Sequence, residues 1–191
     1  MTYEYLLPYK KELIEKKIRY KTNPKYWYAL HRSRDIQMFE QPKIITAEIS
    51  YGCNMTYDTT YMYHATTCYT ILLNERNNEK SLAFLGLFNS RLLWYFLSET
   101  GNVLRGGYFR FKTKYLEPFP IPEIPDDVAD LLSKKVQTVL DAKSVDITAE
   151  TKTIENEINL LVYHLYGLTY DEALVVDPET PITREEYEKN M

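Results

Sequence analysis

The sequence has few cysteines, no secretory leader pattern and no hydrophobic run long enough to cross a bilayer. Cys53 and Cys68 are its two cysteines among 191 residues, which excludes the dense disulfide framework of a small secreted domain. No basic start followed by an apolar core marks a signal peptide. These shortages favour a reducing compartment, so we expect a cytoplasmic protein without a membrane anchor.

The most apolar stretch, residues 82–97, is shorter than the roughly 20 residues that a membrane-spanning helix requires. It also carries Asn89, Ser90 and Arg91 at its centre, where polar side chains would be costly in lipid. We therefore predict one buried helix here. Because buried polar groups need partners, we expect Asn89 and Ser90 to hydrogen-bond a neighbouring element.

Motifs of catalysis are also missing. An adenine methyltransferase needs an Asn-Pro-Pro-aromatic loop, and residues 23–26 (Asn-Pro-Lys-Tyr) lack the second proline. Glu15-Lys16-Lys17 spells the acid-x-Lys triplet of metal-dependent nucleases, but it falls in a predicted helix without a partner acid on a strand. No Gly-x-Ser-x-Gly elbow occurs, and the histidines and cysteines have no zinc-site spacing. We expect neither a metal nor catalysis from this chain alone.

What the sequence does contain is a separation of charge. Residues 1–122 carry 17 Lys and Arg against 11 Asp and Glu, a net charge of +6, whereas residues 123–191 carry 6 against 16, a net charge of −10. Of the 18 tyrosines, 14 also lie before residue 123. This composition suits a surface that faces nucleic acid, although tyrosines on a half-buried sheet with solubilising lysines would give the same composition.

The first part of the chain predicts helices and a small sheet. Apolar residues at helical spacing over 5–18 predict an N-terminal helix. Segments rich in Ile, Thr and Tyr predict strands of a small mixed or antiparallel sheet at 43–50, 55–64 and 66–73. Large apolar side chains expected in the core are Trp27, Phe88, Leu92 and Trp94.

After Gly106 and Gly107, aromatic and basic side chains alternate over residues 108–112, as they would on the two faces of a strand. Prolines then impose an extended segment at the point where the charge reverses, at positions 118, 120, 122 and 125.

Two amphipathic patterns follow and predict a helical hairpin, with Gly167 as a C-terminal cap. We therefore predict an α+β fold with four parts: an N-terminal helix (1–20), a recognition domain (21–125), a helical hairpin arm (126–176) and a flexible acidic tail (177–191).

Five short motifs follow one another in a recognisable order: Trp27-x-x-Leu30-His31-Arg32-x-Arg34, Phe39-Glu40-x-Pro42-Lys43-Ile44-Ile45, Phe88-Asn89-Ser90-Arg91-Leu92, Gly106-Gly107-Tyr108-x-Arg110 and Leu116-x-Pro118-Phe119-Pro120-Ile121-Pro122. In this order they resemble the TaqI-like C-terminal specificity domain, over residues 20–125. Residues 158–169 resemble the helical tail that ends many such enzymes, although Asn159 stands where that tail often has Asp.

The resemblance implies the target-recognition domain of a type IIG restriction enzyme or a related adenine-specific DNA methyltransferase. It implies that the chain is a fragment of a longer parent. S-adenosylmethionine would then be bound by a methyltransferase catalytic domain of the same parent chain or complex. The expected partners are that domain and double-stranded DNA.

Sequence readout needs hydrogen-bond donors on a basic segment, since an arginine can grip both acceptors of a guanine edge. The first candidates flank or alternate with aromatic residues after the paired glycines: Arg105, Tyr108, Arg110, Lys112 and Lys114. Arg32 and Arg34 are expected to clamp phosphates, or else to form structural salt bridges. The alternative for the first group is a hairpin whose lysines simply face water.

Tyr51, Asn54 and Tyr57 lie on a predicted turn, where they could specify or stack a base; ordinary turn chemistry is the alternative. Two other functions also stay open. One is a protein docking or oligomerisation module without DNA specificity, in which the acidic helices bind another domain. The other is single-stranded RNA binding on a sheet, which requires exposed aromatic residues in register on adjacent strands.

Overall fold

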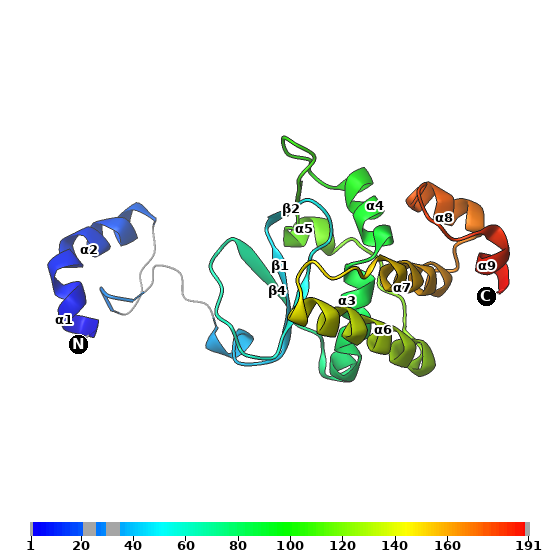
Figure 1. The fold of residues 1–191 in the computed structure, drawn as a ribbon. Helices are drawn as coiled ribbons and strands as arrows, with labels where there is room; N and C mark the ends of the chain where they lie inside the picture. Colours follow the sequence, from blue (N-terminus) through cyan, green and yellow to red (C-terminus); the bar gives the residue numbers. More distant parts are fainter. Residues whose placement is uncertain (1, 21–25, 30–34, 190–191) are drawn as a thin grey trace. The chain divides into compact units, whose positions relative to one another are not determined.

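The computed structural model describes residues 2–20, 26–29 and 35–189, and the chain divides into two compact units, residues 1–40 and 41–191. The predicted α+β fold is confirmed, because helices occur together with two small antiparallel sheets (Figure 1). In these described ranges no helix combines the length and apolar character that crossing a membrane requires.

The first unit contains a helical segment close to the one predicted over 5–18. It consists of α1 (Thr2–Leu6), the 3₁₀ turn η1 (Leu7–Tyr9) and α2 (Lys10–Arg19). Pro8 lies in the 3₁₀ turn, and its missing N–H accounts for the interruption of the helix. The short 3₁₀ helix η2 (Ile36–Met38) follows later in this unit.

An aromatic cluster stabilises the first unit. Trp27, predicted for the core, is half-buried and makes edge contacts with Tyr3 and Tyr28. Lys17 is buried on α2, and its ammonium donates to the carbonyl of Tyr26 at 3.0 Å and to the carbonyl of Trp27. These bonds satisfy a charge that would otherwise be costly to bury.

The second unit begins with the sheets. In the larger one, β1 (Lys43–Ala47) is the central strand between β3 (Thr56–Asp58) and β4 (Cys68–Ile71). In the smaller one, β2 (Ile49–Ser50) pairs with β5 (Phe109–Arg110). All three predicted strand segments contain strands, but each strand is shorter than predicted.

The single helix expected at residues 82–97 is wrong. Two helices occur instead, α3 (Ser81–Phe88) and α4 (Arg91–Thr100), preceded by the 3₁₀ helix η3 (Glu75–Lys80). Ser90 has an extended backbone (ψ 158°), and its hydroxyl accepts a hydrogen bond from the Leu93 N–H at 3.3 Å, so it is the N-cap of α4.

The prediction that Asn89 bonds a neighbouring element is confirmed. Its side chain accepts from the Met55 N–H at 2.8 Å and donates to the Met55 carbonyl at 3.0 Å. One residue later, the Arg91 N–H donates to the Asn159 side chain at 2.8 Å. The break between α3 and α4 is thus joined both to the segment before β3 and to a helix of the hairpin.

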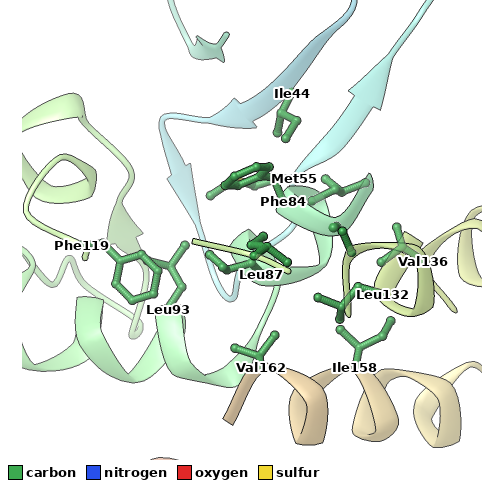
Figure 2. Close-up of a cluster of buried hydrophobic side chains, with 14 of the residues drawn as sticks. Ile44, Met55, Phe84, Leu87, Leu93, Phe119, Leu132, Val136, Ile158 and Val162 are labelled. Atoms are coloured by element: carbon green, nitrogen blue, oxygen red, sulfur yellow. The ribbon is translucent and has the colours of Figure 1, made fainter. Parts of the chain in front are cut away.

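The predicted hairpin is formed by α6 (Asp126–Val145) and α7 (Lys152–Leu165), while the short helix α5 (Thr113–Leu116) follows β5. Figure 2 shows apolar side chains of both hairpin helices meeting α3: Leu87, Leu132, Val136, Ile158 and Val162. A Cβ at Gly86 would come within 2.8 Å of the Val136 side chain, so glycine permits the close approach of α3 and α6. Phe88, Leu92 and Trp94, predicted for the core, are half-buried against it.

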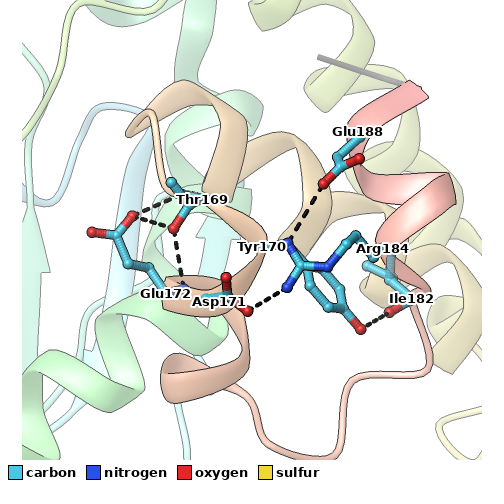
Figure 3. Close-up of polar contacts among 7 residues, drawn as sticks. All are labelled: Thr169, Tyr170, Asp171, Glu172, Ile182, Arg184 and Glu188. Atoms are coloured by element: carbon cyan, nitrogen blue, oxygen red, sulfur yellow. Dashed lines mark hydrogen bonds and ion pairs between the residues drawn. The ribbon is translucent and has the colours of Figure 1, made fainter.

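The C-terminal segment contains α8 (Tyr170–Val176) and α9 (Arg184–Lys189). The expectation of a loosely ordered tail is wrong for residues 184–189, because Tyr187 is 1% exposed and donates its hydroxyl to the Leu168 carbonyl at 2.7 Å. In Figure 3, Arg184 bonds Asp171 of α8 and approaches Glu188 at 3.5 Å. Buried aromatic area, which composition alone does not reveal, holds this acidic segment in place.

Lys43 and Asp58 form an ion pair within the larger sheet, with side chains only 0% and 4% exposed. Asp58 also accepts from the N–H groups of Thr60 and Met62 and from the Thr60 hydroxyl. Burial by itself raises the pKa of Asp58. The hydrogen bonds, from Lys43 first and then from Thr60 and Met62, outweigh it and hold that pKa well below its ordinary value.

Replacing Asp58 by Asn should lower the free energy of unfolding by about 3–5 kcal/mol, because the buried Lys43 charge would lose its ion pair with Asp58. Urea denaturation at pH 7 measures this change. A Lys43→Met/Asp58→Leu double variant should recover part of the loss, since it buries no charge. Since the folded pKa is depressed, the Asp58 contribution is complete above an unfolded pKa of about 4 and is lost as the pH falls below it. Equal stability of Asp58→Asn and wild type would contradict this assignment.

His164 on α7 contacts Tyr187 of α9, with ring centroids 4.4 Å apart. Among the described residues its buried Nε2 has no hydrogen-bond partner. Burial lowers the pKa of His164, and a hydrogen bond with the Tyr187 backbone offsets only part of this effect. The neutral imidazole is therefore the form that fits against α9.

Acidification should loosen α9. The stabilisation is complete above the unfolded histidine pKa of about 6.5 and is lost as the pH falls towards the lower folded pKa. We expect amide exchange of residues 184–189, after correction for intrinsic rates, to accelerate at least about twofold between pH 7.5 and 5.5. His164→Phe keeps a ring without the titration and should abolish the acceleration. An unchanged acceleration in His164→Phe would assign it to another group.

Candidate nucleic-acid interface

The segment around β5 has the two faces that the sequence predicted for residues 108–112. Phe109 packs against the core and Phe111 is fully buried. The side chains of Arg110 and Lys112 are 32% and 39% exposed. One side of this segment is therefore apolar and the other is basic and accessible to solvent.

A tight turn precedes β5. It is closed by hydrogen bonds from the Leu104 N–H to the Tyr108 carbonyl at 2.6 Å and from the Gly107 N–H to the Leu104 carbonyl at 3.2 Å. Gly106 and Gly107 have φ angles of +84° and +78°, a region that side chains other than glycine rarely adopt. Arg105 is exposed on this turn and makes no hydrogen bond or ion pair with any described residue. Its guanidinium can therefore bind a ligand without first losing a partner.

The other cations of this segment differ from Arg105 because they pair with a carboxylate, that of Glu48. Its carboxylate lies 2.8 Å from the Arg110 guanidinium and 3.4 Å from the Lys112 ammonium. The two cations thus share one negative charge between β1 and β2, while Arg110 keeps further N–H donors. The pair holds Arg110 in one position and reduces, without cancelling, the local positive charge.

The remaining basic candidates are placed differently. Lys114 is exposed in α5, and its ammonium lies 4.5 Å from the centre of the Tyr115 ring, a cation–π contact. Arg32 and Arg34 lie outside the described residues, so their roles stay predictions.

The three candidates of the predicted turn also differ from one another in exposure and contacts. Tyr51 is 65% exposed. The Asn54 side chain donates to the Ser50 hydroxyl at 3.0 Å and to the Tyr51 carbonyl at 3.1 Å, which matches the alternative of ordinary turn chemistry. Tyr57 lies in β3 and packs half-buried against the core. Of these three, Tyr51 is therefore the one best placed for direct contact with a ligand.

Sequence reasoning missed two features near these candidates. Glu48 was not singled out, although a lone carboxylate between two strands of apolar and hydroxyl residues is a signal for a cation partner. Residues 61–63 (Tyr-Met-Tyr) were also overlooked: they are 49%, 60% and 59% exposed, and Tyr61 has a φ of +60°. Asp58 fixes the start of this loop through its bonds to Thr60 and Met62.

Burial or hydrogen bonding accounts for two other side chains that can be reactive, Cys53 and His64. Burial raises the pKa of Cys53 to about 12, against a smaller opposing effect of Arg91, so its thiol stays protonated at neutral pH. Both ring nitrogens of His64 lie within hydrogen-bond distance of oxygens, the Ala65 carbonyl at 3.0 Å and the Thr70 hydroxyl at 2.6 Å. Within the described part of the chain, no cluster of three His, Cys, Asp or Glu side chains could hold a metal ion.

A comparison with protein families matches residues 3–121 to the TaqI-like C-terminal specificity domain. The matched range includes the sheets, the α3–α4 pair and the turn with Arg105, and it ends before the acidic helices. It also includes the N-terminal helical segment, residues 1–20, that was predicted to be separate from the recognition domain. Because the match covers more than half of the chain, this protein belongs to the TaqI-like C-terminal specificity domain family, the recognition domains of restriction–modification systems.

Proposed function

We propose that this chain is the sequence-specific duplex DNA recognition domain of a type IIG restriction–modification adenine methyltransferase. In this proposal, a catalytic domain of the same parent chain or complex binds S-adenosylmethionine and transfers the methyl group. The residues described above select the DNA sequence and contribute no catalytic group. A cytoplasmic location accords with this role.

The observation that carries the proposal is the exposed guanidinium of Arg105 on a turn that two glycines with positive φ allow to approach a ligand closely. Arginine is the side chain that most often reads a guanine edge, and it does so with two hydrogen bonds. Arg110, oriented by Glu48, is the second reading candidate. Lys112, Lys114, Arg32 and Arg34 are assigned to phosphates, since most protein–DNA hydrogen bonds go to the backbone.

The charge distribution supports the same proposal. The family-matched range lies entirely in the part of the chain with net charge +6, and the acidic helices follow it. Attraction to phosphates requires such a local excess of positive charge, whatever the overall charge of −4.

A second candidate function, docking to another domain or subunit, is favoured by the hairpin and the helices after it. Exposed apolar side chains there include Leu131, Val145, Ile147 and Val175, and residues 123–191 carry a net charge of −10. A docking arm and a DNA-reading lobe can coexist in one chain. The two functions can be told apart by mutation, because DNA recognition depends on the basic surface and docking depends on the acidic helices.

Selection from a randomised duplex pool at two salt concentrations tests DNA recognition. The wild-type chain should enrich one motif, and the yield should fall with salt as phosphate counterions are released. Arg105→Ala should weaken the free energy of binding to the enriched motif by about 1–3 kcal/mol and should relax base preference at one position of that motif. Lys152→Ala removes the same charge from the exposed start of α7 and should leave the motif unchanged. A pool without any enriched motif would instead favour the docking function.

Replacing Glu48 by Gln should separate affinity from specificity. Arg110 and Lys112 would lose their shared counter-charge, so non-specific affinity for duplex DNA should rise and its dependence on salt should steepen by about one ion. Discrimination at the base read by Arg110 should fall, because the guanidinium would no longer be held in one position. Fluorescence anisotropy across a salt series measures both effects. Unchanged salt dependence would show that these cations lie away from the DNA.

A further inference from the structure

Four aromatic rings form a chain of contacts in space between the turn before β5 and helix α4. Ring centroids are 5.8 Å apart for Tyr108 and Tyr51, 5.9 Å for Tyr51 and Trp94, and 5.0 Å for Trp94 and Phe109. Trp94 and Phe109 pack against the core, whereas Tyr51 and Tyr108 are 65% and 46% exposed. We call Tyr51 and Tyr108 the aromatic pair.

The aromatic pair is held in place from two sides. The Asn54 side chain bonds the turn that carries Tyr51, and Gly52 in that turn has a φ of +97°. A Cβ at Gly107 would lie 3.2 Å from the Tyr51 ring, so glycine leaves room for that ring beside the second turn. Rings that are fixed before binding lose little conformational entropy when a ligand arrives.

The neighbouring charge indicates which ligand the aromatic pair fits. Arg105 lies on the same turn as Tyr108 and is exposed, while the nearby carboxylate of Glu48 is already matched by Arg110 and Lys112. Exposed aromatic faces beside a cation match nucleic acid, in which one base stacks on a ring while acceptor groups of a neighbouring nucleotide bind the cation. An apolar protein segment would fit the rings but would leave the guanidinium without a counter-charge. A base inside an intact helix is already stacked on both faces, so the ligand must be an unpaired base.

We propose that the aromatic pair is a stacking site for an unpaired base of DNA, next to the base edge that Arg105 is proposed to read. The proposal rests on the DNA-binding function proposed above and adds a second mode of contact to it. Base edges would be read by Arg105 and by the basic face of β5, while the aromatic pair would stabilise DNA in which one base has left the stack. Enzymes that modify a base must extrude it, so such a site would lower the cost of opening the helix.

Binding of the 191-residue chain to two duplexes tests the site. One duplex is fully paired, and the other has the same sequence with a single unpaired thymine. The wild type should bind the second about tenfold more tightly, the effect of stacking one base on an aromatic ring. Tyr51→Leu/Tyr108→Leu should lose this preference and bind the two duplexes with equal affinity. Tyr51→Phe/Tyr108→Phe keeps the rings and should keep the preference.

A second measurement needs no variant, so misfolding cannot affect it. With 5-iodouracil as the unpaired base, irradiation should cross-link wild-type protein at Tyr51 or Tyr108, because this photoreaction favours stacked aromatic rings. Equal affinity for the two duplexes, or a cross-link at other residues, would overturn the stacking site. The proposed function would still stand if the paired duplex were bound with salt dependence and an enriched motif. Failure to bind either duplex would overturn both proposals.

Discussion

The structure depends on the interruption of one apolar helix at Asn89, Ser90 and Arg91. A continuous helix would leave these backbone and side-chain groups without the partners they have here: Met55 before β3, Leu93 in the next turn and Asn159 on α7. The break lets α3 pack into the hairpin and α4 run in its own direction. It therefore joins the sheet, the helical pair and the hairpin at one place.

The direction of α4 has a consequence for the candidate interface. Trp94 of α4 supports Tyr51, and Tyr51 in turn contacts Tyr108 on the turn that carries Arg105. An exposed arginine on an unsupported turn would lose more conformational freedom on binding than one whose turn is fixed by packed rings. A continuous set of ring contacts thus connects the core to the candidate interface. The Asn54 side chain adds a hydrogen bond to the Tyr51 carbonyl in this set.

Carboxylates determine which cations are available. Asp58 forms an ion pair with the buried Lys43, and Glu48 forms ion pairs with Arg110 and Lys112. Arg105 pairs with neither carboxylate. Most acidic residues from position 123 onward lie in the hairpin and the helices that follow it, and one of them, Asp126, pairs with Lys80 of the family-matched range at 2.6 Å. The small net charge of the chain therefore conceals a basic part and an acidic part.

The sequence by itself determined the fold class, the hairpin, the two faces of residues 108–112 and the family, because periodicity and motif order are local properties of the chain. It also predicted that Asn89 needs a partner. Only the tertiary structure decided that this need breaks the helix, that Tyr187 packs the acidic tail and that Glu48 pairs with Arg110. Each of these depends on residues far apart in sequence that meet only after folding, so spacing along the chain could not reveal them.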